Sequence, residues 1–333
     1  MSTPTPTTKS ATTSRGLTYT YLHVPPQPGQ PTLLLLHGFP STAHDWRHTL
    51  PHFAARGLGV LAPDMLGYGG TDKPVDPAAY VGAAQARDLV DLLDAEGAAR
   101  VVAVGHDWGA MPTAYLAALH QDRFEGFVFL AVGLALARGF KIEQVLPFLK
   151  QLFGTEIYGY WDFFNKEEAA GIIEKNLDSL FDLLFVKDTE LWKTVMNPVG
   201  AIDSFIAEGK RAEVGDFVTE KDREIWRSAL EKGGLTAPLN WYKATCRGLH
   251  DTDGLDISTD TLRITKPVLY IGGRRDFVCR PEIQEGDFRK TCADLQFEVF
   301  EEAGHWMQLE VPGRTNEAIE KWAEVKGLLK PTQ

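Results

Sequence analysis

Asp107 lies in the segment Gly105-His-Asp-Trp-Gly109, directly after the apolar run 101–104 and before a helical pattern. A strand that turns sharply into a helix at a small-x-acid-x-small sequence projects its middle side chain out of the sheet, as in a nucleophile elbow. The two glycines allow the close backbone approach that such a turn needs. A carboxylate at this position, where serine is usual, is already ionised. It can attack a saturated carbon that bears a leaving group, which leaves an ester on the enzyme. The pattern therefore predicts Asp107 as the nucleophile that cleaves a carbon–oxygen or carbon–halogen bond.

The alternative for Asp107 is that it only caps the helix that follows it. The same letters, His-Asp-Trp, recur at positions 44–46, where Arg47 follows and no buried strand leads in. It is therefore the strand before Asp107 and the small residues around it that favour the nucleophile, and the tripeptide alone does not.

The partners of such a nucleophile follow it along the chain in the order acid, then histidine. Of the nine histidines, only His305 comes after the last strand-like run, 296–300, and it is the predicted general base. Asp276 follows the apolar run 267–271, whereas the stretch after the run 127–130 holds no carboxylate. Asp276 is therefore predicted to orient His305 and to stabilise its charged form.

Two backbone N–H groups near the elbow are the predicted oxyanion hole. The segment His37-Gly-Phe-Pro40 directly follows an apolar run. The N–H groups of Phe39 and Trp108 are expected to bind the negative oxygen that forms when water attacks the ester.

Short apolar runs that alternate with helical patterns indicate how these residues are positioned. Runs that are apolar on both sides suit strands buried between two layers of helices. The runs are residues 32–36, 59–62, 101–104, 127–130, 267–271 and 296–300, and residues 78–96 are a predicted helix. This order predicts an α/β fold with a mostly parallel, doubly wound sheet.

The pattern changes between residues 138 and 244, where aromatic-rich helical segments replace the strand-like runs. The predicted helices there are 146–153, 167–185, 190–196 and 222–232. We interpret 138–244 as a helical cap inserted into a core made of residues 16–137 and 245–333. Residues 1–15 are rich in Ser, Thr and Pro and are predicted to be a disordered tail.

Over residues 16–329 the chain resembles soluble epoxide hydrolases of the α/β-hydrolase superfamily. The matching motifs are His37-Gly-Phe-Pro40, Ala62-Pro-Asp-Met-Leu-Gly-Tyr-Gly69, Gly105-His-Asp-Trp-Gly109 and Gly304-His-Trp306. The resemblance implies an α/β-hydrolase fold with a cap, and hydrolysis of epoxides to vicinal diols through a covalent ester on Asp107. Haloalkane dehalogenases share these motifs and are the alternative function. Many of them carry Asn where this chain has Phe39, and that difference counts against halide release.

Two tyrosine motifs in the predicted cap favour the epoxide. An alkoxide is a far poorer leaving group than a halide and needs a hydrogen-bond donor, for which epoxide hydrolases use two cap tyrosines. The similar motifs here are Tyr158-Gly-Tyr-Trp-Asp-Phe-Phe164 and Leu239-Asn-Trp-Tyr242. The resemblance implies Tyr160 and Tyr242 as the donors, with Tyr158 a close competitor of Tyr160. The alternative is that these tyrosines only pack the cap. Trp161 and Phe164 are expected to bind an apolar substrate.

Composition argues against several function classes. The formal net charge is −11 with both signs mixed along the chain, which argues against nucleic acid or another polyanion as partner. No apolar run is long enough to span a bilayer, and neither end has the pattern of a signal peptide or lipid anchor. The three cysteines fit no disulfide framework, so a soluble, cytoplasmic protein is expected.

The predicted chemistry needs a small apolar epoxide and water, and no cofactor. His44, His48 and His52 recur every fourth residue, but Pro51 interrupts their helix. They are interpreted as solvated surface residues, and no metal site is expected. A ligand-binding protein that kept the fold and lost turnover is the alternative from another class, and no oligomeric state is predicted.

Overall fold

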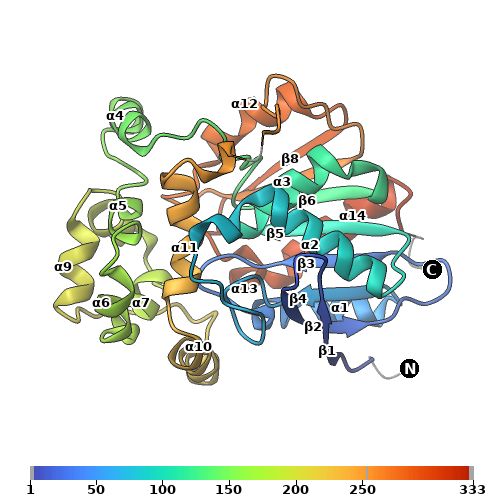
Figure 1. Cartoon of the computed structure of the whole chain (residues 1–333), viewed down its shortest axis with the longest axis horizontal. Helices are drawn as coiled ribbons and strands as arrows, with labels where there is room; N and C mark the ends of the chain where they lie inside the picture. Colours follow the sequence, from blue (N-terminus) through green and yellow to red (C-terminus); the bar gives the residue numbers. More distant parts are fainter. Residues whose placement is uncertain (1–3, 253, 330–333) are drawn as a thin grey trace.

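An eight-stranded sheet runs through the core of the protein (Figure 1). The computed structural model describes residues 4–252 and 254–329. The strands lie in the order β1-β2-β4-β3-β5-β6-β7-β8; the pairings β1–β2 and β2–β4 are antiparallel and the others are parallel. Their bounds are β1 Thr7–Thr12, β2 Thr18–Val24, β3 Thr32–Leu36, β4 Gly59–Pro63, β5 Val101–His106, β6 Gly126–Leu130, β7 Val268–Gly273 and β8 Leu295–Phe300.

Helices cover both faces of this sheet. Every residue of β3 to β7 is buried, which explains why these strands are continuously apolar in sequence. A Cβ atom added to Gly105 would meet Thr113 of α3, whereas one added to Gly126, on the opposite face, would meet Trp322 of α14. The core helices are α1 Thr49–Ala55, α2 Gly82–Ala95, α3 Ala110–Leu119, α12 Pro281–Thr291, α13 Met307–Glu310 and α14 Pro312–Val325.

A helical cap is inserted between β6 and β7. It contains α4 Ile142–Phe153, α5 Tyr160–Phe164, α6 Ala169–Glu174, α7 Leu177–Leu184, α8 Trp192–Val195, α9 Ala201–Ala207, α10 Glu220–Gly233 and α11 Thr236–Cys246. Figure 1 shows α5, α6, α7 and α9 grouped on one side of the molecule, with α11 between them and the sheet. Short 3-10 turns link the elements at Ala43–Trp46, Pro77–Tyr80, Asp107–Gly109, Gln121–Arg123, Thr189–Leu191 and Leu249–Asp251. None of the helices in the described part of the chain is long and apolar enough to cross a membrane.

The predicted fold class, an α/β-hydrolase sheet with an inserted cap, is confirmed. The six predicted strands are all present, with ends that differ by two residues or fewer. The predicted helix 167–185 is instead two helices, α6 and α7, because the backbone leaves the helical region at Asn176. The predicted domain boundaries at 138 and 244 remain predictions, and α11 continues past the second of them to Cys246.

The predicted disordered tail over residues 1–15 is wrong for its described part. Residues Thr7–Thr12 form β1, which pairs with β2 from Thr7 opposite His23 to Thr12 opposite Thr18. β1 is mostly exposed, so its sequence lacks the apolar residues that mark a buried strand. Its threonines nevertheless suit an edge strand, because β-branched side chains favour extended backbone. Residues 1–3 lie outside the described residues.

Candidate active site

The turn from β5 into α3 holds Asp107 in a left-handed backbone conformation. Its φ angle is 51°, which costs a residue with a side chain about 1–2 kcal/mol. The neighbours must be glycine: a Cβ atom on Gly109 would lie 2.1 Å from the Leu36 carbonyl oxygen, and one on Gly105 would lie 2.5 Å from the Gly109 carbonyl oxygen. The structure therefore contains the sharp strand-to-helix turn that the sequence predicts.

The loop after β3 places a backbone donor on the Asp107 carboxylate. The Phe39 N–H donates to Asp107 Oδ1 at 2.8 Å. His37 holds the loop in place: its Nε2 accepts a hydrogen bond from the Met65 N–H at 2.9 Å, which leaves Nδ1 to donate to the Gly38 carbonyl at 2.9 Å. A Cβ atom on Gly38 would lie 2.2 Å from Asp107 Oδ1 and 2.6 Å from the Trp108 nitrogen. The backbone nitrogens of Phe39 and Trp108 therefore both lie beside this carboxylate.

His305 lies between two carboxylates. Its Nδ1 donates to Asp276 Oδ2 at 2.7 Å, and its Nε2 lies 3.5 Å from Asp107 Oδ2. Burial alone would lower the pKa of His305, but the negative charges and hydrogen bonds of Asp276 and Asp107 outweigh it and raise this pKa well above 6.5. Burial alone would raise the pKa of Asp107, but the hydrogen bond and charge of His305 hold it below its usual value. The three side chains that the sequence selects thus meet in one charged cluster.

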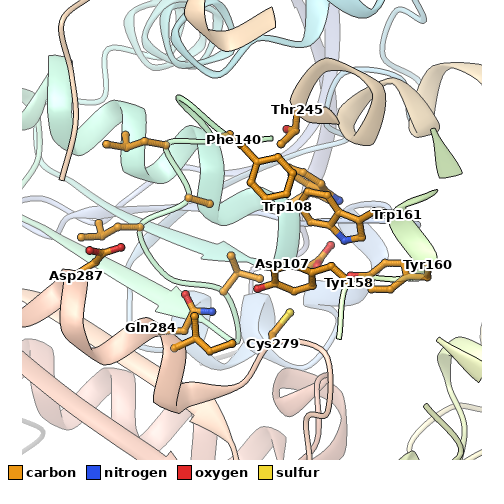
Figure 2. Close-up of a pocket in the computed structure, with 16 residues that line it drawn as sticks. Asp107, Trp108, Phe140, Tyr158, Tyr160, Trp161, Thr245, Cys279, Gln284 and Asp287 are labelled. Atoms are coloured by element: carbon orange, nitrogen blue, oxygen red, sulfur yellow. The ribbon is translucent and has the colours of Figure 1, made fainter. Parts of the chain in front are cut away.

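A cavity of about 260 Å³ opens onto Asp107. Figure 2 shows Tyr158 and Tyr160 beside the Asp107 carboxylate, with Gln284 and Asp287 toward the other side of the cavity. Most of the remaining wall is apolar or aromatic. The lining side chains are Asp107, Trp108, Val132, Leu134, Ala135, Leu136, Ala137, Phe140, Tyr158, Tyr160, Trp161, Thr245, Cys279, Ile283, Gln284 and Asp287.

The predicted substrate-binding residues Trp161 and Phe164 have different positions. Trp161 lines the cavity. Phe164 is fully buried and packs against the rings of Phe39 and Tyr242, with centroids 5.1 and 4.9 Å away. Phe164 is not among the described residues that line the cavity. Its ring supports the cavity wall from behind.

Tight packing fixes the first tyrosine motif. A Cβ atom on Gly159 would lie 2.0 Å from the Asn197 carbonyl oxygen, so this chain segment presses against another part of the cap. The Tyr160 N–H donates to the Met196 carbonyl at 2.9 Å. Tyr160 therefore begins α5 at a defined position beside the cavity.

The second tyrosine motif is anchored to the core by its first two residues. The Asn240 side-chain amide donates to the Val75 carbonyl at 3.0 Å, and the Trp241 indole N–H donates to the Leu66 carbonyl at 2.9 Å. Tyr242 does not line the cavity; its ring lies between those of Phe39 and Trp108, with centroids 5.1 and 4.9 Å away. The centroid of Tyr160 lies 6.0 Å from it. The two cap helices α5 and α11 thus bring both tyrosines near Asp107.

The electrostatic surroundings separate Tyr160 from Tyr158. Burial raises the pKa of Tyr160, and the nearby Cys279 and Asp107 add to the rise. Burial likewise raises the pKa of Tyr242, as do Tyr160 and Asp107. Burial also raises the pKa of Tyr158, but the charges that act on it are those of Cys279 and Asp276, and the Gln284 side chain partly offsets the rise. Asp107 therefore acts on the hydroxyls of Tyr160 and Tyr242.

Comparisons with known proteins give the family. The model of the alpha/beta hydrolase fold family matches residues 31–312. Epoxide hydrolase A of Mycobacterium tuberculosis is 31% identical over 311 residues, which cover 88% of this chain and 90% of that protein. The chain belongs to the epoxide hydrolase family.

Solved structures of this family share the whole architecture. Epoxide hydrolase A from Mycobacterium thermoresistibile superimposes with a TM-score of 0.80 at 27% identity, covering 96% of this chain and 98% of that one. An epoxide hydrolase from an endophytic Streptomyces gives a TM-score of 0.82 at 26% identity, with coverage of 96% and 95%. The mouse bifunctional epoxide hydrolase 2 is 27% identical over 92% of this chain, which spans only 54% of the mouse protein.

Two positioning residues in this epoxide hydrolase family member were missed from the sequence. His106 Nε2 donates to the His305 carbonyl at 2.9 Å, and burial together with the charge of His305 lowers the pKa of His106 to about 3. Glu310 accepts hydrogen bonds from the Gly304 and Trp306 N–H groups at 2.6 and 2.8 Å. Both contacts fix the backbone on either side of His305. The available signals were the position of His106 beside Asp107 and an acidic residue, Glu310, five positions after His305.

Asp276, Cys279 and His305 form the group of possible metal ligands found among the described residues. Asp276 Oδ2 accepts the hydrogen bond from His305, and its Oδ1 accepts from the Val278 and Cys279 N–H groups at 3.0 and 2.8 Å. Because both oxygens already face donors, this arrangement suits the orientation of an imidazole better than it suits metal binding.

The surface histidines are less solvated than predicted. His44 Nε2 lies 2.7 Å from Asp222 Oδ1, and His52 Nε2 lies 2.7 Å from Glu320 Oε2. Both imidazoles are only about one-third exposed, at 31% and 33%. The interpretation as solvated residues holds for His48, which is exposed, and is wrong for His44 and His52, because acidic side chains on α10 and α14 partly cover them.

Proposed function

We propose that this chain hydrolyses small apolar epoxides to vicinal diols with water, through an ester formed on Asp107. The observation that carries the proposal is the Asp107 carboxylate, which opens onto the cavity together with Tyr160 and contacts the His305–Asp276 pair behind it. The names of the relatives agree with this reaction.

In the first step Asp107 Oδ2 attacks one epoxide carbon, and the bond from that carbon to the ring oxygen breaks. Oδ1 stays in the hydrogen bond with the Phe39 N–H and becomes the ester carbonyl oxygen. The ring oxygen leaves with the electron pair and takes a proton from Tyr160. Tyr242 does not line the cavity, but its ring lies 6.0 Å from that of Tyr160, and it is the proposed second donor once the bound epoxide brings the oxygen within its reach. Burial keeps both phenols protonated until an alkoxide, a much stronger base, forms beside them.

In the second step His305 removes a proton from water as the water oxygen attacks the ester carbon. The Phe39 and Trp108 N–H groups stabilise the oxyanion, and Asp276 stabilises the imidazolium. The bond from the ester carbon to the diol oxygen then breaks, and that oxygen takes the proton from His305. The second proton of the water is left on the Asp107 carboxyl and passes to the Tyr160 phenolate, which restores both groups. Ester formation removes the charge of Asp107, one of the charges that raise the pKa of His305. The imidazole therefore becomes available as a base after the first step.

The competing function is a haloalkane dehalogenase with the same nucleophile. Two phenol groups near Asp107 suit a basic alkoxide, which needs a proton, better than they suit a halide, which does not. At position 39 the chain has phenylalanine, whose side chain packs against Phe164 and Tyr242 and offers no polar group.

Turnover of a matched substrate set tests the reaction class. We expect the purified chain to convert styrene oxide to its diol, to release no bromide from bromoalkanes of similar size, and to lose diol formation in Asp107→Ala. Bromide release without diol formation would establish the dehalogenase instead. The cytoplasmic location, inferred from the cysteines, remains a prediction.

A further inference from the structure

The cavity carries a second carboxylate away from the nucleophile. Asp287, an exposed residue of α12, lines the same cavity as Asp107. Figure 2 shows Asp287 and Tyr160 on opposite sides of this space. Among the described residues that line the cavity, Asp107 and Asp287 are the acidic ones, and none is lysine, arginine or histidine.

The charge of Asp287 is not neutralised by the protein. Its acidic neighbours on α12 are paired: Glu282 with Arg274 and Arg280, and Glu285 with Arg289. The Asp287 side chain has no ion pair or hydrogen bond to any described residue.

The polar group next to Asp287 offers little compensation. The Gln284 side-chain oxygen accepts a hydrogen bond from the Gly133 N–H at 3.1 Å. This side chain also acts on the Tyr158 hydroxyl, whose pKa it lowers. Gln284 is neutral and already faces protein groups, so a ligand carboxylate near Asp287 would find no strong donor there.

We infer that Asp287 makes this cavity selective for small neutral or cationic epoxides and against epoxides that carry a carboxylate at the end remote from the ring. The inference rests on the proposed function, which fixes the epoxide at Asp107 and Tyr160. The remote end of the substrate must then lie in the rest of a cavity of about 260 Å³, a size near the lower limit for ligand sites. Two like charges a few ångströms apart in a partly solvated site repel enough to reduce binding about fivefold.

Three styrene oxides that differ only in the para substituent provide the test: a carboxylate, a carboxamide and an aminomethyl cation. For the natural chain we expect kcat/KM for the carboxylate to be about fivefold below that for the carboxamide. In Asp287→Asn this difference should largely disappear, and the aminomethyl compound should lose a similar factor. The carboxamide should change less than about twofold, because it carries no charge.

Glu285→Gln is the matched control, since it removes one negative charge from the same helix at a residue that does not line the cavity. The inference is overturned if the natural chain hydrolyses carboxylate and carboxamide equally well, or if Glu285→Gln changes their ratio as much as Asp287→Asn does. If the carboxamide is not hydrolysed at all, the proposed function fails and the inference falls with it. If it is hydrolysed and no discrimination by charge is found, only the inference fails.

Discussion

Two tyrosines line the cavity within three residues of each other, yet their hydroxyls have different partners. The charge of Asp276 acts on the Tyr158 hydroxyl, beside the Gln284 side chain, whereas the charge of Asp107 acts on the Tyr160 hydroxyl, beside the Trp161 side chain. A donor to the leaving oxygen must lie close to the carbon that Asp107 attacks. This requirement favours Tyr160 as the proposed donor over Tyr158, which the sequence alone left as a competitor.

Separate substitutions of these tyrosines should therefore have unequal effects. We expect Tyr160→Phe to lower kcat/KM for styrene oxide by about 10²-fold, the usual effect of losing one donor to a developing oxyanion. Tyr158→Phe, which removes a hydroxyl of the same size from the same cavity, should cost less than about tenfold. Steady-state kinetics of both variants checks this, and a larger loss in Tyr158→Phe would reverse the assignment.

His305 should also link stability to pH. Its folded-state pKa lies well above the ordinary value of 6.5 because of Asp276 and Asp107. A histidine whose pKa is raised by folding stabilises the folded state fully at pH values below its pKa in the unfolded state. This contribution is lost as the pH rises through its pKa in the folded state. Each unit of the rise corresponds to about 1.4 kcal/mol.

We therefore expect the difference in unfolding free energy between the natural chain and His305→Gln to shrink as the pH rises above about 6.5. Urea unfolding at several pH values measures this difference, and groups common to both proteins cancel in it. A difference that stays constant over this range would show that the imidazole is not held in its charged form by its neighbours.

At the scale of elements, the nucleophile depends on how closely β3 and β5 approach α3. Leu36 of β3 pairs with Gly105 of β5, and this register places the Leu36 carbonyl against Gly109. A side chain at position 109 would have to displace backbone of the central sheet, which cannot move independently of its neighbours. The elbow is therefore a property of three elements together.

The variant Gly109→Ala should destabilise the protein by about 1–3 kcal/mol, the usual cost of forcing one extra carbon into packed structure. Gly171→Ala in α6 is the matched control, since a Cβ atom there meets nothing within 4 Å. Alanine at that helical position should be neutral or stabilise by up to about 1 kcal/mol. Equal unfolding free energies for the two variants would contradict the close approach at the elbow.

At the scale of the whole molecule, the sequence predicted mainly those strands that are buried along their whole length. The six strands could be recognised because they are apolar along most of their length, and the order of nucleophile, acid and histidine then followed from the fold. The antiparallel strands β1 and β2 were missed. β1 is mostly exposed, and its pairing with β2 depends on contacts that leave little trace in either segment. β2 did carry a signal in its alternating buried and partly buried residues.

The parts of the site that the sequence did not predict depend on contacts between distant segments. Glu310 and His106 act on the backbone around His305, and neither belongs to the chemistry that the motifs describe. Phe164 was placed in the substrate site because of its motif, but its ring packs against Phe39 and Tyr242 and does not line the cavity. Such contacts between the cap and the core cannot be predicted without knowing how the cap packs on the sheet.

A single turnover in water enriched in ¹⁸O tests the central claim, a covalent ester on Asp107, most directly. With enzyme in excess over epoxide, water oxygen enters the Asp107 carboxylate, and the diol takes its new oxygen from that carboxylate. Mass spectrometry of the peptide that contains Asp107 should therefore find ¹⁸O in this side chain, and the diol of the first turnover should be unlabelled. Label in the diol with none in Asp107 would show that water attacks the epoxide directly, and would contradict the ester.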